Sequence, residues 1–96
     1  MTLRRICCLS LLMLSGFLTS ALPAQETAQY FRQNCFSCHT IGGGKLTGPD
    51  LKGITSRRDR DWLVDFILDP ISVIAGGDAY AEQLVEESNG VIMPAL

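Results

Sequence analysis

Two thiols and an imidazole lie within five consecutive positions of this 96-residue chain, in the run Cys35-Phe36-Ser37-Cys38-His39. Two cysteines separated by two residues and followed directly by a histidine form the attachment signature of c-type haem. Each thiol can form a thioether bond with a haem vinyl group, and the adjacent imidazole can bind the iron as its proximal ligand. The run therefore predicts a covalent haem on Cys35 and Cys38, with His39 as the first axial ligand.

Two other kinds of site also use closely spaced cysteines. A thioredoxin-like redox pair is expected near a βαβ pattern, and the sequence shows no such pattern. A structural zinc site needs about four nitrogen or sulfur ligands. Beyond its N-terminal region the chain offers only Cys35, Cys38 and His39 in a cluster, and His39 is its single histidine. Haem attachment is the interpretation that these residues favour.

Two further motifs follow the histidine along the chain. Gly48-Pro49-Asp50-Leu51 comes first, then a helical stretch with Trp62, and Met93-Pro94 stands near the end. The motifs in this order resemble a monohaem class I cytochrome c, over about Thr27 to Pro94. The resemblance implies a small all-α fold of three or four helices around one covalently bound haem c.

The resemblance also implies roles for individual side chains. The carbonyl of the Gly-Pro proline, here Pro49, accepts a hydrogen bond from the proximal histidine and so orients the imidazole. Met93 is the second axial ligand, and a Met/His pair raises the reduction potential. Trp62 has two open interpretations, because it either donates its indole N–H to a haem propionate or packs in the core. The implied cofactor-binding residues are Cys35, Cys38, His39, Pro49, Trp62 and Met93, and the implied iron ligands are His39 and Met93.

The N-terminal residues have the pattern of a secretory signal peptide. A positive start with Arg4 and Arg5 precedes an almost uncharged apolar run, and a site that suits cleavage ends at Ala24. The apolar run is shorter than the ~20 residues that span a bilayer. We expect a signal peptide over residues 1–24 and a cytochrome c domain over residues 25–96, exported to the periplasm by a Sec-type route. An uncleaved signal that tethers the protein to the membrane is the alternative.

The charge of the predicted mature domain disfavours one class of partner. The whole chain has 8 basic and 10 acidic residues, and two of the basic ones belong to the predicted signal. A mildly acidic domain does not suit nucleic acid, whose phosphates attract basic surfaces. It suits transient docking on the basic surface of a redox protein, and it suits equally well a solvated acidic face that has no partner. We expect the partners to be a membrane donor complex and a terminal reductase or oxidase.

The predicted mature domain is small. About 72 residues remain after the signal, and a chain of this size gains only marginal stability from its own apolar core. A covalent haem would supply a large apolar surface for the core side chains. We therefore expect that loss of haem weakens the fold.

Apolar periodicity and capping residues predict helices on both sides of a loop. The first helix covers 26–34, and the glycine-rich run at 42–45 predicts a flexible loop rather than a phosphate-binding loop. The second helix opens with a capping-box pattern at 56–59, where Ser56 is the expected cap, and ends before Pro70.

A third helix is predicted over 79–88. Asp78 precedes it as the expected N-cap, and Asn89-Gly90 follows it as the expected end. Tyr80, Leu84 and Val85 are expected to face the core, while the acidic side of this helix is expected to face solvent.

These predictions indicate a single-electron carrier and not an enzyme. With His39 and Met93 as ligands in both oxidation states, little reorganisation accompanies electron transfer. The main alternative is a haem with an open position that binds or senses a small ligand, as follows if Met93 is not bound. Class I cytochromes continue after Met-Pro into a C-terminal helix, whereas this chain stops at Leu96. We therefore expect that helix to be absent or truncated, and a fragment of a longer cytochrome is the second alternative.

Overall fold

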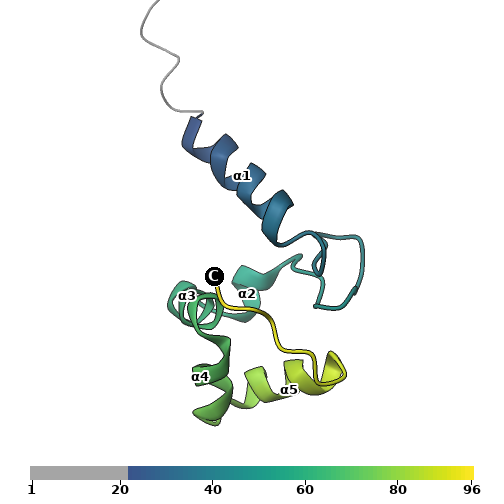
Figure 1. The fold of residues 1–96 in the computed structure, drawn as a ribbon, viewed down its shortest axis with the longest axis vertical. Coiled ribbons are helices and arrows are strands. Elements are labelled where there is room, and N and C mark those ends of the chain that lie inside the picture. The colour runs from purple at the N-terminus through teal and green to yellow at the C-terminus, as the bar shows by residue number, and fades with distance from the viewer. Residues whose placement is uncertain (1–21) are drawn as a thin grey trace, which may run out of the picture. The chain divides into compact units, whose positions relative to one another are not determined.

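The computed structural model describes residues 22–96, and within them every regular element is a helix. The predicted all-α fold class is therefore confirmed for this part of the chain. Residues 1–34 and 35–96 form two compact units, and each is described by itself. Figure 1 shows the helices in chain order. Their bounds are α1 Leu22–Asn34, α2 Ile54–Arg57, α3 Arg60–Leu68, α4 Pro70–Ala75 and α5 Ala79–Glu87.

Helix α1 is the regular element described in the first unit. Within the described residues it covers Leu22–Asn34, so it includes the helix predicted over 26–34 and shares its end at Asn34. Most of the predicted signal peptide lies outside the described residues, and the predicted cleavage point after Ala24 falls within α1. The signal and its cleavage stay predictions.

Asp59 begins helix α3, which corrects the N-cap predicted at Ser56. The Asp59 carboxylate accepts a hydrogen bond from Trp62 N at 2.8 Å. Ser56 lies inside the short helix α2, which ends at Arg57. Aspartate and serine cap helices about equally well, so the sequence alone does not distinguish them. The predicted end of this helix before Pro70 is confirmed.

Asp69 links α3 to α4, a helix that the sequence pattern does not predict. Its carboxylate accepts hydrogen bonds from Ser72 N at 3.1 Å and from Ser72 Oγ at 2.6 Å. Pro70 occupies the start of α4, where its fixed φ and missing N–H suit a helix. With 6 residues, α4 is too short to show an apolar period in the sequence.

Helix α5 agrees with the third predicted helix at both ends. Asp78 is its N-cap and accepts a hydrogen bond from Ala81 N at 2.8 Å. At the other end, Asn89 adopts a left-handed conformation with a φ of 55°. Gly90 N then donates to Val85 O at 2.8 Å. This pair of features is a Schellman motif, which satisfies a carbonyl left open by the end of the helix.

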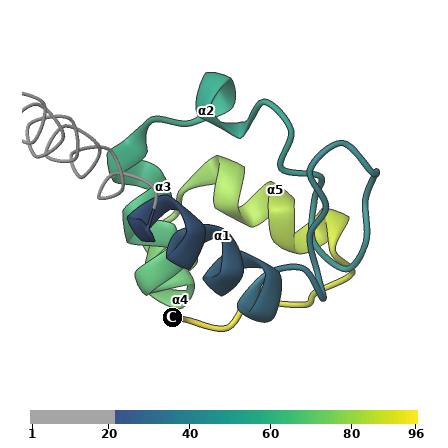
Figure 2. The same ribbon diagram turned by 90° about the horizontal axis from the view of Figure 1, so that it is seen from above.

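Helix α4 contacts both α3 and α5, so the three helices form one packed set within the second unit (Figures 1 and 2). After α5 the chain has no regular structure and returns to α3, as both views show. Leu96 N donates to Ile67 O at 3.1 Å. The Ile67 carbonyl can accept this bond because the last carbonyls of a helix have no partner inside it.

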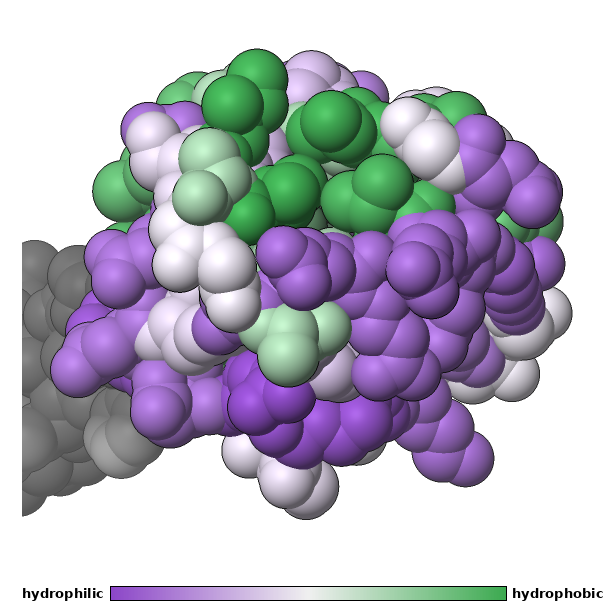
Figure 3. Space-filling model, turned by 90° about the horizontal axis from the view of Figure 1, so that it is seen from below, coloured by the Kyte–Doolittle hydropathy of each residue, from purple (hydrophilic) through white to green (hydrophobic). Residues whose placement is uncertain are grey.

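Few apolar side chains are buried in the described part of the chain. There, Ala81 is the buried hydrophobic residue, and Pro70 is the large side chain with almost no exposure. Figure 3 shows apolar side chains gathered on one face of the molecule. Four apolar residues at helical spacing on α3 and α4 are each more than a third exposed: Val64, Ile67, Leu68 and Ile71. The second unit therefore has little core of its own, as expected for a domain of this size.

Candidate haem-attachment site

The cysteine–histidine run forms a single turn at the start of the second unit. His39 N donates to Cys35 O at 3.0 Å, and Cys38 N donates to the same carbonyl at 3.2 Å. Both thiols are free and half-buried. The local backbone therefore brings the three predicted residues together on one turn.

The imidazole of His39 is oriented by the backbone of Pro49. Its Nδ1 lies 2.9 Å from Pro49 O. A carbonyl oxygen only accepts hydrogen bonds, so Nδ1 carries the proton and donates it. The other ring nitrogen, Nε2, keeps its lone pair and can bind a metal. The hydrogen bond implied for Pro49 by the family resemblance is thus present in the structure.

Gly48 allows the imidazole to lie directly against the backbone. A Cβ atom at this position would stand 2.4 Å from Cε1 of His39 and 2.8 Å from Nδ1. Real Cβ atoms essentially never come so close, so any side chain here would displace the ring. Gly48 N also donates to Cys38 O at 2.8 Å, which holds this segment against the cysteine turn. Gly48 is therefore part of the site for a steric reason.

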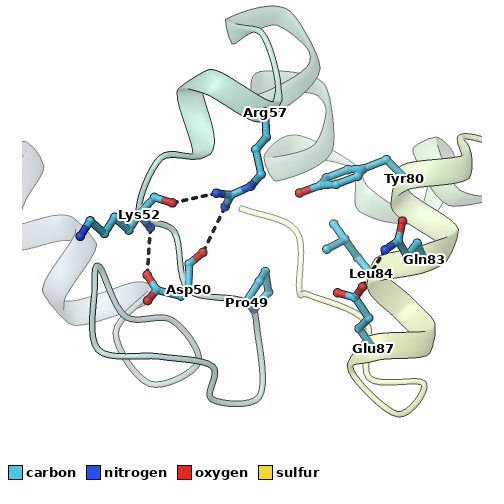
Figure 4. A pocket seen from close by; sticks show the side chains of 8 residues that line it. All are labelled: Pro49, Asp50, Lys52, Arg57, Tyr80, Gln83, Leu84 and Glu87. Carbon is cyan, nitrogen blue, oxygen red and sulfur yellow. Dashed lines mark hydrogen bonds between the residues drawn. The ribbon is translucent and has the colours of Figure 1, made fainter.

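A cleft of about 520 Å³ opens between the segment with Pro49 and helix α5. Its volume lies in the range of small-molecule and cofactor sites. Figure 4 shows Pro49 on one side of the cleft and Tyr80 and Leu84, from α5, on the other. Pro49 is the lining residue whose carbonyl also binds the His39 ring, and His39 itself does not line the cleft. The lining residues are Pro49, Asp50, Lys52, Arg57, Tyr80, Gln83, Leu84 and Glu87.

Trp62 lies in a cluster of aromatic rings from α3 and α5. Its ring stacks on Phe66 with centroids 4.9 Å apart, and it meets Tyr80 nearly edge-on at 5.3 Å. The guanidinium of Arg58 lies over the Tyr80 ring, 3.8 Å from its centroid. The indole N–H donates to Asp78 Oδ2 at 3.0 Å, so it binds the cap of α5. Trp62 is thus half-buried in this cluster, and its contact with a haem propionate stays a prediction.

Met93 lies in the irregular segment after α5 and is half-buried. The hydrogen bond from Leu96 to Ile67 attaches this segment to α3. The local backbone does not bring Met93 to the cysteine turn as it brings His39, because the two are far apart in the sequence. Ligation of the iron by Met93 stays a prediction.

The donor set of the turn suits a covalent haem. Cys35 and Cys38 offer two thiols, and His39 offers an oriented imidazole whose Nε2 is open. Across residues 22–96, no group of three or more His, Cys, Asp or Glu residues could hold a metal ion. The zinc alternative therefore finds no ligand set in this part of the chain.

A small all-α fold with two thiols and a backbone-oriented imidazole on one turn fits the class of proteins that attach haem covalently. The family model described as cytochrome c matches residues 24–92. The chain belongs to the cytochrome c family, whose function is haem-based electron transfer. The predicted family is thereby confirmed.

Solved structures agree with this assignment. Cytochrome c from Rhodothermus marinus is 30% identical, with a TM-score of 0.69 over 84% of this chain and 67% of that protein. The cytochrome c domain of the pp3183 protein from Pseudomonas putida is 38% identical, with a TM-score of 0.59 over 72% of this chain and 69% of that domain.

A further structure is an engineered form of the Rhodothermus marinus protein, bound to a carbene intermediate. It is 32% identical, with a TM-score of 0.67 over 84% of this chain and 69% of that protein. No match is found among curated proteins. Within residues 22–96, no helix has the length and apolarity needed to cross a membrane.

Proposed function

We propose that this protein is a periplasmic electron carrier with one haem c, attached through Cys35 and Cys38 and ligated by His39 and Met93. The observation that carries the proposal is the hydrogen bond from His39 Nδ1 to Pro49 O at 2.9 Å. It leaves Nε2 as the free nitrogen of a fixed ring, which is what an axial ligand requires. Membership of the cytochrome c family supports the attachment of haem beside it.

Haem c supplies reversible one-electron exchange at its iron. The residues of this chain prepare the site for that exchange. The Pro49 carbonyl, by accepting a hydrogen bond from Nδ1–H, makes Nε2 of His39 a stronger electron donor to a metal. The Met93 thioether is a soft ligand that favours the reduced state. A haem held by both residues would keep the same ligands in both oxidation states, so the protein would reorganise little when an electron moves.

Arg58 is the candidate partner of a haem carboxylate. Its Nε is buried and has no hydrogen-bond partner in the described part of the chain. The neighbouring Arg57 instead donates to Lys52 O at 2.8 Å and to Asp50 O at 3.2 Å. A buried donor without an acceptor is costly, and a propionate oxygen would satisfy it.

The proposed setting is an exchange of electrons between a membrane donor complex and a terminal reductase or oxidase. The predicted signal peptide supports export, and maturation of haem c after export fits this route. The acidic balance of the mature domain supports transient docking on basic protein surfaces. Rates of electron transfer to such a partner are expected to fall as salt concentration rises.

Covalent attachment is tested by expressing the full chain with the c-type maturation machinery and staining for haem after denaturing electrophoresis. We expect a stained band for the wild type and none for the double variant Cys35→Ala/Cys38→Ala. A control variant, Ser37→Ala, keeps both thiols and should stain like the wild type. Absence of stain in the wild type would overturn the proposal.

The alternative of an open haem position is tested with carbon monoxide. A haem with two protein ligands binds this gas slowly or not at all, whereas an open position binds it rapidly. We expect little binding by the reduced wild type and rapid binding by Met93→Ala. Ile92→Ala, which changes the neighbouring residue, is the matched control and should behave as the wild type. Rapid binding by the wild type would favour a ligand-binding haem protein.

A further inference from the structure

The Asp50 carboxylate accepts three backbone hydrogen bonds from the chain around it. Gly42 N donates to Oδ1 at 2.7 Å, Lys52 N donates to the same oxygen at 2.9 Å, and Gly44 N donates to Oδ2 at 2.9 Å. These bonds lower the pKa of Asp50 below its ordinary value, with the bond from Gly42 as the largest cause. Asp50 is therefore an organising centre of the loop between His39 and Lys52.

Other hydrogen bonds also hold this loop, among them those from Gly48 N to Cys38 O at 2.8 Å and from Leu46 N to Gly48 O at 3.1 Å. Gly42 and Gly44 have φ values of 89° and 93°, so they adopt conformations that other residues rarely reach. Glycines lose much conformational freedom on ordering, so a loop that contains them must be held by specific contacts. Thr40 supplies two others: its Oγ1 donates to Gly44 O at 2.6 Å, and its carbonyl accepts from Leu51 N at 2.8 Å.

Asp50 is coupled to the His39 ring through one peptide group. The carbonyl of Pro49 and the N–H of Asp50 belong to the same planar unit, so neither turns without the other. On its other side, the Asp50 carbonyl accepts from Arg57 Nη2 at 3.2 Å. Hydrogen bonds thus fix both the side chain and the carbonyl of Asp50. Because the Pro49 carbonyl shares a peptide plane with Asp50, these bonds also fix its direction toward His39.

We propose that Asp50 is a positioning residue for the axial histidine: by anchoring the glycine loop, it aims the Pro49 carbonyl at His39 Nδ1 and thereby sets the reduction potential. This inference rests on the proposed function, since a potential requires a bound haem. A well-aimed carbonyl strengthens His39 as a donor and favours the oxidised state. Loss of the anchor should therefore raise the potential.

A simple charge effect would also raise the potential when Asp50 is neutralised, so the variants must separate position from charge. Asp50→Asn removes the charge and the bond from Gly44, while its amide oxygen can keep the other two. Asp50→Glu keeps the charge but moves the carboxylate by one methylene. Asp69→Asn is the matched control, because Asp69 also binds backbone in α4 and also has a lowered pKa.

The experiment uses the full chain and two measurements by NMR and redox titration. Hydrogen exchange at Gly44 N–H and at the His39 ring Nδ1–H reports the loop and the ring bond directly. We expect both to exchange about five- to tenfold faster in Asp50→Asn and Asp50→Glu, the loss expected for about one hydrogen bond. We also expect both variants to raise the reduction potential, and Asp69→Asn to leave ring exchange unchanged.

Two results would overturn the proposed role of Asp50. If Asp50→Glu keeps the wild-type potential and ring exchange while Asp50→Asn raises the potential, Asp50 acts through charge alone and the proposal is wrong. Unchanged ring exchange in both Asp50 variants also overturns it. If the wild type carries no haem, the proposed function fails, whereas exchange at Gly44 and at the His39 ring still tests whether Asp50 positions the ring. Asp50→Glu is the milder change and serves if Asp50→Asn does not fold.

Discussion

At the scale of single residues, the close approach of the His39 ring to the Gly48 backbone fixes where the imidazole lies. The ring occupies the space that a side chain in place of Gly48 would need, because its Cβ atom would lie only 2.4 Å from Cε1 of His39. The same ring donates to the carbonyl of the next residue, Pro49. Glycine and proline therefore have different tasks here, because one makes room for the imidazole and the other orients it.

Replacing Gly48 by alanine should displace the ring and weaken its hydrogen bond. We expect a loss of about 1–3 kcal/mol in the free energy of unfolding, as for other overpacked sites. Thermal or denaturant unfolding of the full chain measures it. Gly43→Ala is the milder comparison and should lose less, because the nearest atoms that a Cβ there would meet belong to the Thr40 side chain, at 3.2 to 3.4 Å. Equal losses in the two variants would contradict the steric account.

The hydrogen bonds to Asp78 predict how the free energy of unfolding depends on pH. Its pKa lies below the ordinary value of 3.8, chiefly because of the hydrogen bond from Ala81 N and then that from the Trp62 indole. A carboxylate with a lowered folded pKa stabilises the fold above its unfolded pKa. That stabilisation is lost as the pH falls through the folded pKa.

Asp78→Asn should therefore reduce the difference in melting temperature between pH 7 and pH 3. It should also change the fluorescence of Trp62, whose indole bonds to Asp78. Asp65→Asn, on the exposed side of α3, is the control and should keep the wild-type pH dependence. An unchanged pH dependence in Asp78→Asn would mean that this carboxylate does not contribute as its contacts indicate.

At the scale of elements, the C-terminal end of α5 depends on a residue in an unusual conformation. Asn89 is the non-glycine residue with positive φ in the described part of the chain, at 55°. Its conformation turns the chain from α5 into the segment with Met93. Glycine reaches this conformation freely, whereas an alanine at this φ carries a cost of about 1 kcal/mol.

We therefore expect Asn89→Gly to keep or slightly increase stability, and Asn89→Ala to decrease it by about 1 kcal/mol. Chemical denaturation of the two variants and the wild type checks this order. Ser88→Ala, at the preceding position, is the control for loss of a polar side chain. A more stable Asn89→Ala than Asn89→Gly would contradict the assigned turn.

The elements also show what a sequence can and cannot predict. Helix α5 is predictable because Asp78 and Asn89-Gly90 mark its ends unambiguously. The start of α3 is not, since Ser56 and Asp59 are both good caps and only packing selects one. Helices α2 and α4 are missed because 4 and 6 residues are too few for a period.

The candidate site also contains features that the sequence predicts and features that it does not. The cysteine turn is predictable because the backbone between Cys35 and His39 is local. The anchoring by Asp50 joins residues up to eight positions apart through glycines that carry no side-chain pattern. Its one signal is the bond to Lys52 N, two residues on, which is typical of an aspartate in an Asx turn. The Met93-Pro94 motif implies Met93 as a ligand, but its approach to the cysteine turn depends on contacts between residues far apart in the sequence, so this ligation stays a prediction.

At the scale of the whole molecule, the second unit has little buried apolar surface and an open row of apolar residues on α3 and α4. A covalent cofactor with a large apolar face would compensate for that small core. The proposed haem is thus a part of the fold as well as the redox centre.

Cys35→Ala/Cys38→Ala, which cannot attach haem, should therefore lose most of its cooperative unfolding. Circular dichroism during heating should show a broad, low-temperature transition, in contrast to a sharp one for the haem-bound wild type. Ser37→Ala is the control and should unfold like the wild type. A sharp transition in the double variant would show that the polypeptide forms a sufficient core alone.

The most direct test of the account is the visible spectrum of the purified full chain in both oxidation states. We predict the ferric red-edge absorption band of sulfur–iron ligation, present in the wild type and in Ile92→Ala but lost in Met93→Ala. With covalent haem established, that band makes His39 and Met93 the axial pair and electron transfer the function. Covalent haem without the band in the wild type would contradict the account.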